Sequence, residues 1–392
     1  MLTRLELEGF KNFRKATLDL GPLTVLVGAN AAGKSNIRDA LRFLHGISRG
    51  YSLAEIIGEK YGPGGEQIWA GIRGGNREIF FDSKHFLRID VEARCDASLI
   101  TNVVTSENYR EFEYNIRVTA DVSGESPRTI YESLYFPLAN LGSPQGGGHF
   151  AFQAYAMGSG TSPAYAATAT MVYAVAATLL GSLGNVIEIR ESGPILSMVL
   201  DEGAKFIGDP EAGVRVRHEL GSMRFLDLNP EAMRRPSLPG QTILGDRGEN
   251  LASVLHAICQ DETSKATLLD WVRELTPMDA ADFEFPADPT GRIMLMLVER
   301  SGRKITAYSA SDGTLRFLAI IAALLGPHPA SFYFFEEIDN GIHPARLHLL
   351  LQLIEQVVAN RIRFSMPRWC IACRITRKAA SNGSSTFPAP RS

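Results

Sequence analysis

The first 48 residues alternate between apolar and polar positions and then change to a helical period. Residues 5–8 (Leu-Glu-Leu-Glu) and 18–20 (Leu-Asp-Leu) alternate, which predicts two half-exposed strands. Residues 23–27 (Leu-Thr-Val-Leu-Val) are apolar and β-branched, as in a buried strand. Apolar residues then recur at helical spacing over residues 37–44. The pattern therefore predicts strands followed by a helix.

The middle of the chain shows three further patterns. Residues 78–136 contain segments with a period of two, which predicts antiparallel strands with one exposed face. Residues 137–187 contain no charged side chain, and their sparse aliphatic residues favour a linker or a packed small-residue helix over a membrane span. Residues 188–285 are mainly helical in pattern, with Asn250 as the expected cap of one helix.

Strand and helix patterns return towards the end. Residues 293–298 and 304–308 are strand-like, whereas residues 315–325 are apolar almost all round, which is typical of a buried helix. Residues 332–335 (Phe-Tyr-Phe-Phe) predict another buried strand, and a helix follows from Pro344.

These patterns predict an α/β core interrupted by a large mixed α+β insertion. The expected units are 1–60 (first part of the core), 61–290 (insertion: β-rich 78–136, low-charge linker 137–187, mainly helical 188–285), 291–360 (second part of the core) and 361–392 (irregular basic tail).

Composition narrows the class of protein. Of 392 residues, 45% are hydrophobic and 21% are charged, as in soluble globular proteins. The net charge of −3 does not indicate a protein that holds DNA by charge alone, although it leaves DNA contact open. Four cysteines are too few for a disulfide framework, and the N-terminus contains no apolar leader. We expect a cytoplasmic protein without a membrane partner.

Residues 28–35 (Gly-Ala-Asn-Ala-Ala-Gly-Lys-Ser) match the phosphate-binding loop G-x-x-x-x-G-K-[ST] at every fixed position. The glycines let the backbone amides turn towards a phosphate chain, Lys34 reaches the β- and γ-phosphates, and the Ser35 hydroxyl ligates Mg²⁺. A buried strand before the loop and a helix after it are the required context. The candidate nucleotide-binding residues here are Gly28, Asn30, Gly33, Lys34, Ser35 and Asn36.

Two adjacent carboxylates follow the buried strand 332–335. In P-loop ATPases, an acid at this place holds Mg²⁺ and a second one orients and deprotonates the attacking water. We therefore expect Glu336 at the metal, and Glu337 together with Lys34 in catalysis. Further upstream, the Ser311 hydroxyl and the Gly313 amide at the start of the buried helix form a second candidate anion site.

Together these motifs resemble the RecF/SMC/OLD branch of ABC-type ATPases, which are also described as AAA-type ATPases. The resemblance implies a P-loop NTPase fold like an ABC-ATPase head, with ATP and Mg²⁺ as cofactors. The segments that carry it are 5–13 (Leu-Glu-Leu-Glu-Gly-Phe-Lys-Asn-Phe), 28–35, 311–314 (Ser-Asp-Gly-Thr) and 335–344 (Phe-Glu-Glu-Ile-Asp-Asn-Gly-Ile-His-Pro), with weaker matches at 69–75 and 223–230.

The family also implies a partner and a setting. Two heads sandwich ATP in a homodimer, so Ser311 and Gly313 would meet the γ-phosphate across the interface, while Lys11 and Asn12 would lie near the base and ribose. The family acts in DNA repair and phage defence. No nuclease domain is recognisable in the chain, so a nuclease or DNA-processing partner would do any cutting. An ABC transporter subunit is a third reading, against which the long insertion counts.

The tail departs from the family. Residues 361–392 hold seven basic and no acidic residues, without the expected buried strand or its switch histidine. A truncated or frame-shifted C-terminus is one explanation and a divergent tail is the other. On either view, removing the tail should change hydrolysis little. If the switch histidine is missing, the alternative function is a nucleotide-sensing module that hardly hydrolyses. Cys370 and Cys373 form only a lone C-x-x-C, a weak zinc signal.

Overall fold

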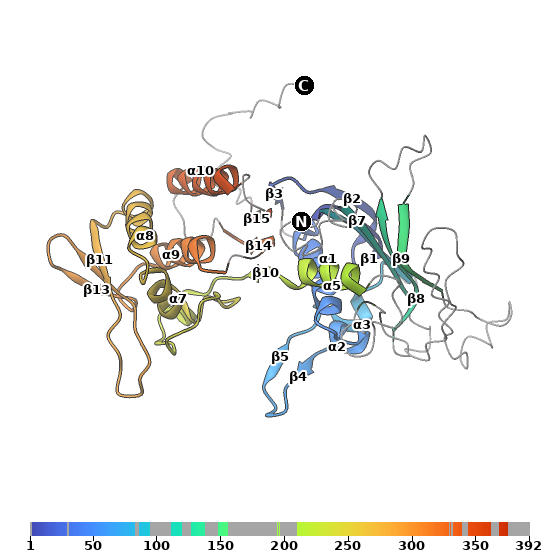
Figure 1. Cartoon of the computed structure of the whole chain (residues 1–392), viewed down its shortest axis with the longest axis horizontal. Coiled ribbons are helices and arrows are strands. Elements are labelled where there is room, and N and C mark those ends of the chain that lie inside the picture. Colours follow the sequence, from blue (N-terminus) through green and yellow to red (C-terminus); the bar gives the residue numbers. More distant parts are fainter. Residues whose placement is uncertain are drawn as a thin grey trace, which may run out of the picture.

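A six-stranded antiparallel sheet and a four-stranded parallel sheet organise the computed structural model of this α/β protein. In Figure 1 the antiparallel sheet and its helices form one lobe, a second lobe holds α7 to α10, and the parallel strands lie between them. The structure describes residues 2–29, 31–82, 86–94, 111–119, 127–137, 148–155, 194, 196, 210–328, 330, 332–338, 344–361 and 368–374.

The antiparallel sheet has the strand order β2-β1-β6-β7-β8-β9. Its alternating sequence buries one face: Leu5 and Leu7 of β1, and Tyr114 and Ile116 of β7, are at most 3% exposed. Because β6 pairs directly with β1, the β-rich part of the predicted insertion extends the N-terminal sheet. The bounds are β1 Leu2–Phe10, β2 Phe13–Asp19, β6 Phe86–Arg94, β7 Glu111–Thr119, β8 Arg128–Pro137 and β9 Gly148–Tyr155.

Short helices pack against this sheet to form the core of the first lobe. The predicted helix after the loop is α1, whose apolar face, including Leu41 and Leu44, is fully buried. Gly46 allows α1 to approach α2, since a Cβ there would lie 2.8 Å from Ile56. The other elements of this lobe are α1 Lys34–Ser48, α2 Leu53–Ile57, β4 Lys60–Tyr61, β5 Gln67–Trp69, α3 Gly75–Glu78 and α5 Pro210–Gly221.

The parallel sheet has the strand order β10-β14-β15-β3. As predicted, β14 is buried, with Phe332 and Phe334 at most 1% exposed. The prediction of a buried strand at residues 23–27 is wrong, because β3 is half-exposed, with Val25 and Val27 40% and 59% exposed. The prediction of a wholly irregular tail is wrong for residues 368–374, which form β15 between β14 and β3. The centre of this short segment is apolar, which suits a strand that pairs with a neighbour on each side. The basic residues around it make this signal hard to recognise in the sequence. The bounds are β3 Leu23–Gly28, β10 Met223–Leu226, β14 Phe332–Glu336 and β15 Arg368–Arg374.

The second lobe has its own hydrophobic core around α9. That helix is buried almost all round, as its sequence predicts. Asn250 does precede α7, but its side chain bonds Gly245 and Ile243 in the preceding loop rather than capping the helix. The bounds are α6 Pro230–Met233, α7 Leu251–Ile258, α8 Glu262–Leu275, β11 Ala280–Glu284, β12 Met296–Glu299, β13 Lys304–Thr306, α9 Asp312–Leu325 and α10 Pro344–Arg361.

The prediction of a linker or packed helix at 137–187 is wrong for residues 148–155, which form β9 at the edge of the antiparallel sheet. The rest of this low-charge segment, at 138–147 and 156–187, lies outside the described residues. Across the described residues, no helix combines the length and hydropathy that a membrane crossing requires.

The position of β15 reverses the expectation that residues 361–392 can be removed at little cost. Deleting them takes away the strand between β14 and β3 and leaves the facing backbone groups of both strands unpaired. Along the buried β14, each such group costs about 1–3 kcal/mol. Because whole domains are stable by only about 5–15 kcal/mol, we expect insoluble or unfolded protein. The control is deletion of 375–392, which keeps β15. Equal solubility and melting temperature of the two truncated proteins would contradict a structural role for β15.

His45 links the first lobe to the start of β10. Its Nδ1–H donates to Leu220 O at 2.9 Å, and the ring lies against Trp69 and Phe225. Burial lowers the pKa of His45 from 6.5 to about 4, so the folded protein holds this ring neutral.

A pH dependence of stability follows from His45. Between pH 6.5 and 4 the unfolded chain binds a proton at this residue and the folded chain does not. The free energy of unfolding should therefore fall as pH falls through this range, by up to about 3 kcal/mol. Urea titrations at several pH values measure the slope, and a His45→Phe variant should lose this part of it. An unchanged slope in that variant would assign the dependence to other groups.

Candidate functional site

The loop predicted to bind phosphate connects β3 to α1. Gly33 has φ +97°, a conformation that favours glycine, and it stands directly before the first residue of α1. Gly28 does not have a positive φ; a Cβ there would instead approach the Cβ of Ala32 to 3.3 Å. Ala31, with φ +62°, adopts a conformation that non-glycine residues rarely take. Close packing and a left-handed turn thus give the loop its tight curve.

Lys34 folds back over this loop. Its Nζ donates to Gly28 O at 2.5 Å and to Ala29 O at 2.8 Å, so the ammonium lies beside the loop backbone. Since α1 begins at Lys34 without a side-chain cap, its first amides are available to an anion. A lysine and a helix N-terminus at one loop make a site suited to a phosphate chain.

The turn between β1 and β2 packs onto the same loop. A Cβ at Gly33 would lie 2.7 Å from Phe13 and 2.9 Å from the Asn12 amide, and Asn36 Nδ2 donates to Asn12 Oδ1 at 2.8 Å. Asn12 therefore borders the loop. Asn30 lies outside the described residues.

Lys11, expected near the base and ribose, has its ammonium engaged elsewhere. Its Nζ lies 2.5 Å from Asp39 Oδ2 and 2.7 Å from Arg73 O, and Arg73 also pairs with Asp39. Asp39 is only 2% exposed on the inner face of α1. The sequence analysis did not predict this cluster. The available signal was Asp39 itself, an acidic residue among the apolar positions of the helix at 37–44.

Ser35 and Glu336 meet although 301 positions separate them in sequence. The Ser35 hydroxyl donates to Glu336 Oε1 at 2.5 Å, and the other oxygen, Oε2, pairs with the Arg38 guanidinium. A serine hydroxyl and a carboxylate are hard oxygen ligands of the kind that Mg²⁺ prefers. These residues therefore fit the predicted magnesium site, and Arg38 is a partner that the sequence did not reveal.

Glu337 follows directly at the end of β14. It is half-buried and has φ +52°, a rare backbone conformation for a residue with a side chain. Strained backbone of this kind is frequent at functional sites, and here it stands next to the predicted metal ligand.

The second candidate anion site begins α9 in the other lobe. Ser311 caps the helix, its Oγ accepting from Thr314 N at 3.1 Å, and Gly313 lies in the first turn. Arg234 holds this turn from outside, with Nη2 2.6 Å from Asp312 Oδ1 and 3.3 Å from Ala310 O. In the described part of the chain, no hydrogen bond joins this turn to residues 28–35.

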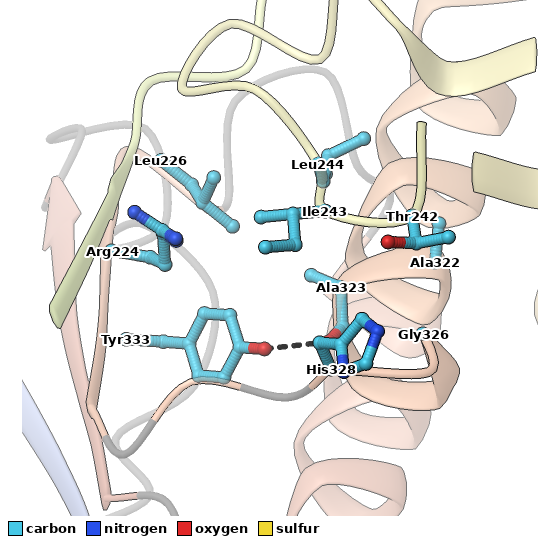
Figure 2. Close-up of a pocket in the computed structure, with 10 residues that line it drawn as sticks. All are labelled: Arg224, Leu226, Thr242, Ile243, Leu244, Ala322, Ala323, Gly326, His328 and Tyr333. Atoms are coloured by element: carbon cyan, nitrogen blue, oxygen red, sulfur yellow. Dashed lines mark hydrogen bonds between the residues drawn. The ribbon is translucent and has the colours of Figure 1, made fainter. Parts of the chain in front are cut away.

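Figure 2 shows a small cavity at a different place. It lies between β10, β14, α9 and the segment of Thr242 and Leu244, near the amino end of β14, whereas Glu336 is at the carboxyl end. Tyr333 OH donates to Ala323 O at 2.7 Å beside it. Its volume of about 10 Å³ admits about one water molecule, which is too little for a substrate.

The zinc reading of Cys370 and Cys373 gains no support. Both cysteines belong to β15, so they lie on a strand of the parallel sheet. His343, which the sequence assigns to the turn before α10, lies outside the described residues.

Comparison with known proteins finds one relative by sequence over a short stretch. A chromosome partition protein Smc from Halothermothrix orenii is 44% identical over 63 residues, which are 14% of this chain and 5% of that protein. The chain thus spans only a small part of that relative.

Three solved structures match 95% of this chain and 89% of their own chains. They are the SmcHead bound to the C-winged helix domain of ScpA (13% identity, TM-score 0.49), the SMC head domain from Thermotoga maritima (12%, 0.42) and the Smc head domain with an extended coiled coil bound to the C-terminal domain of ScpA derived from Pyrococcus furiosus (11%, 0.45).

A family match covers most of the chain. Residues 23–143 and 190–364 match the family described as "AAA domain, putative AbiEii toxin, Type IV TA system". Because the matched residues include the loop at 28–35 and the carboxylates at 336–337, the predicted AAA-type P-loop ATPase fold is confirmed. The chain belongs to this AAA-domain family.

Proposed function

We propose that this protein is a magnesium-dependent ATPase head that dimerises around ATP and thereby switches an effector. The observation that carries the proposal is the contact between Ser35 and Glu336, with Lys34 at the same loop. A phosphate-binding loop and a carboxylate brought together by the fold are the parts that phosphoryl transfer needs, since its catalysis rests on positioning and charge.

Each residue has a distinct role in this proposal. The loop backbone at the N-terminus of α1 and the Lys34 ammonium bind the phosphate chain, for which Lys34 exchanges its two carbonyl partners for phosphate oxygens. Ser35 and Glu336 would hold Mg²⁺, which would supply positive charge for the phosphate chain when bound. Glu337 orients the attacking water and takes its proton.

The second anion site completes the proposed reaction from a second copy of the chain. Ser311 and Gly313 present a hydroxyl and a helix N-terminus, which suit the γ-phosphate bound by the other head. Arg234 fixes the turn for that contact through Asp312.

The effector is proposed by analogy. The family description names a putative toxin of a type IV TA system, and two of the similar SMC heads are bound to domains of ScpA. We infer a role in phage defence or DNA repair in the cytoplasm, exerted through a nuclease or DNA-processing partner.

A nucleotide-sensing module with little hydrolysis is the second candidate. One observation favours it: β15 occupies the place beside β14 and β3, yet residues 368–374 contain no histidine to sense the γ-phosphate. Steady-state ATP turnover distinguishes the two, since only the ATPase releases phosphate over many cycles.

Replacing Lys34 by Ala should weaken ATP binding about 100-fold, because the phosphates lose two charge-assisted hydrogen bonds. Fluorescence titration with a labelled ATP analogue measures the affinity, and Lys15→Ala, a change of an exposed lysine on β2, is the matched control. Equal affinity of both variants would remove Lys34 from the site.

Replacing Glu337 by Gln should leave ATP binding intact while slowing hydrolysis roughly 100-fold or more, because the water loses its base. The variant should then accumulate as an ATP-bound dimer, seen by light scattering after size exclusion with ATP and Mg²⁺. Adding Ser311→Arg to this variant should abolish the dimer. Normal turnover by a monomeric Glu337→Gln protein would overturn both the role of Glu337 and the sandwich.

A further inference from the structure

Arg38 pairs with Glu336 beside the proposed magnesium site, but the roles proposed above do not include it. We propose that Arg38 is a positioning residue, which orients the Glu336 carboxylate so that one oxygen stays directed at Ser35 and the metal. This inference rests on the proposed nucleotide site but adds a residue to it.

The two oxygens of Glu336 are divided between two partners. Oε1 accepts from the Ser35 hydroxyl and Oε2 pairs with Arg38, so the arginine occupies the oxygen that the serine does not use. Metal binding at Ser35 and Oε1 can therefore leave the Arg38 pair in place. A carboxylate that is paired through one oxygen rotates less freely. Outer-shell partners strengthen metal sites in this way, because they keep the ligand oriented towards the metal.

The fold allows this arrangement because both partners come from one helix. Ser35 and Arg38 are three residues apart, so they lie on the same face of α1, towards the end of β14. The side chains of Arg38 and Glu336 are 15% and 17% exposed. Partial burial limits competition from water and strengthens the pair relative to one at the surface.

The next arginine on this face of α1, Arg42, contacts Trp69. Arg42, one turn after Arg38, stacks its guanidinium 4.5 Å from the centre of the Trp69 ring. Burial and repulsion by the charge of Arg38 lower the pKa of Arg42, while the charges of Asp246 and Asp39 act to raise it. Attraction to Glu336 offsets this repulsion for Arg38 and provides a reason for its orientation.

The change in metal affinity on replacing Arg38 shows whether this residue orients Glu336 or competes with the metal for it. If Arg38 orients Glu336, its loss weakens metal binding about 10-fold or more, the size usual for outer-shell partners. If Arg38 only competes with the metal for the carboxylate, its loss tightens metal binding. A merely structural arginine would change the melting temperature and leave metal affinity unchanged.

The test measures Mn²⁺ affinity by electron paramagnetic resonance in the presence of a non-hydrolysable ATP analogue. We expect Arg38→Met to bind Mn²⁺ at least 10-fold more weakly, with its affinity for the analogue in EDTA unchanged. Arg38→Lys, which keeps the charge, should recover part of the loss. Arg300→Met, at an arginine that is 63% exposed in the second lobe, is the matched control and should equal the wild type.

The outcomes separate this inference from the proposed function. Wild-type protein that binds no ATP analogue, with or without metal, would overturn the proposed function itself. Wild type that binds the analogue, with Mn²⁺ affinity equal or tighter in Arg38→Met, would overturn the positioning role alone. If Arg38→Met fails to fold, as judged by circular dichroism, the milder Arg38→Lys decides, and Mn²⁺ affinity equal to wild type in that variant overturns the inference.

Discussion

The contact between Ser35 and Glu336 depends on β15, a strand from near the end of the chain that pairs with Glu336 on β14 and with Gly28 at the start of the loop. β14 and β3 are not neighbours, because β15 lies between them, pairing Glu336 with Ala372 on one side and Leu26 with Ala372 on the other. Neighbouring strands lie about 4.8 Å apart, so one intervening strand sets the distance across which α1 and β14 face each other. Without β15, the sheet would not hold the proposed metal ligands Ser35 and Glu336 at this separation.

The first lobe holds the loop from the opposite side. The turn between β1 and β2 packs on Gly33, while Lys11, Asp39 and Arg73 join that turn to α1. Asp39 is buried with two cations, and removing either of them would leave its charge poorly compensated, which is costly. The nucleotide loop is therefore clamped between a parallel sheet and a charged cluster, which limits its freedom before any ligand binds.

The second lobe carries the other anion site on a helix that is itself a core element. α9 is apolar nearly all round and buried, so its N-terminal turn stands on a rigid support. Arg234 adds a contact from a segment 78 residues away. Rigid support of a short turn suits recognition of phosphate, because little conformational freedom is lost on binding.

The sequence by itself determined the local parts of this protein: the loop at 28–35, the buried strand before Glu336, the buried helix after Ser311 and the alternating strands. Each depends on periodicity or on fixed spacing within a few residues. Only the tertiary structure decided that Arg38 pairs with Glu336, that Arg234 holds Asp312, and that residues 368–374 are a central strand. These features arise from contacts between segments far apart in the chain. In the last case, the local strand signal of a short segment among basic residues is weak. Pairing with a neighbouring strand on each side nevertheless makes this segment a strand.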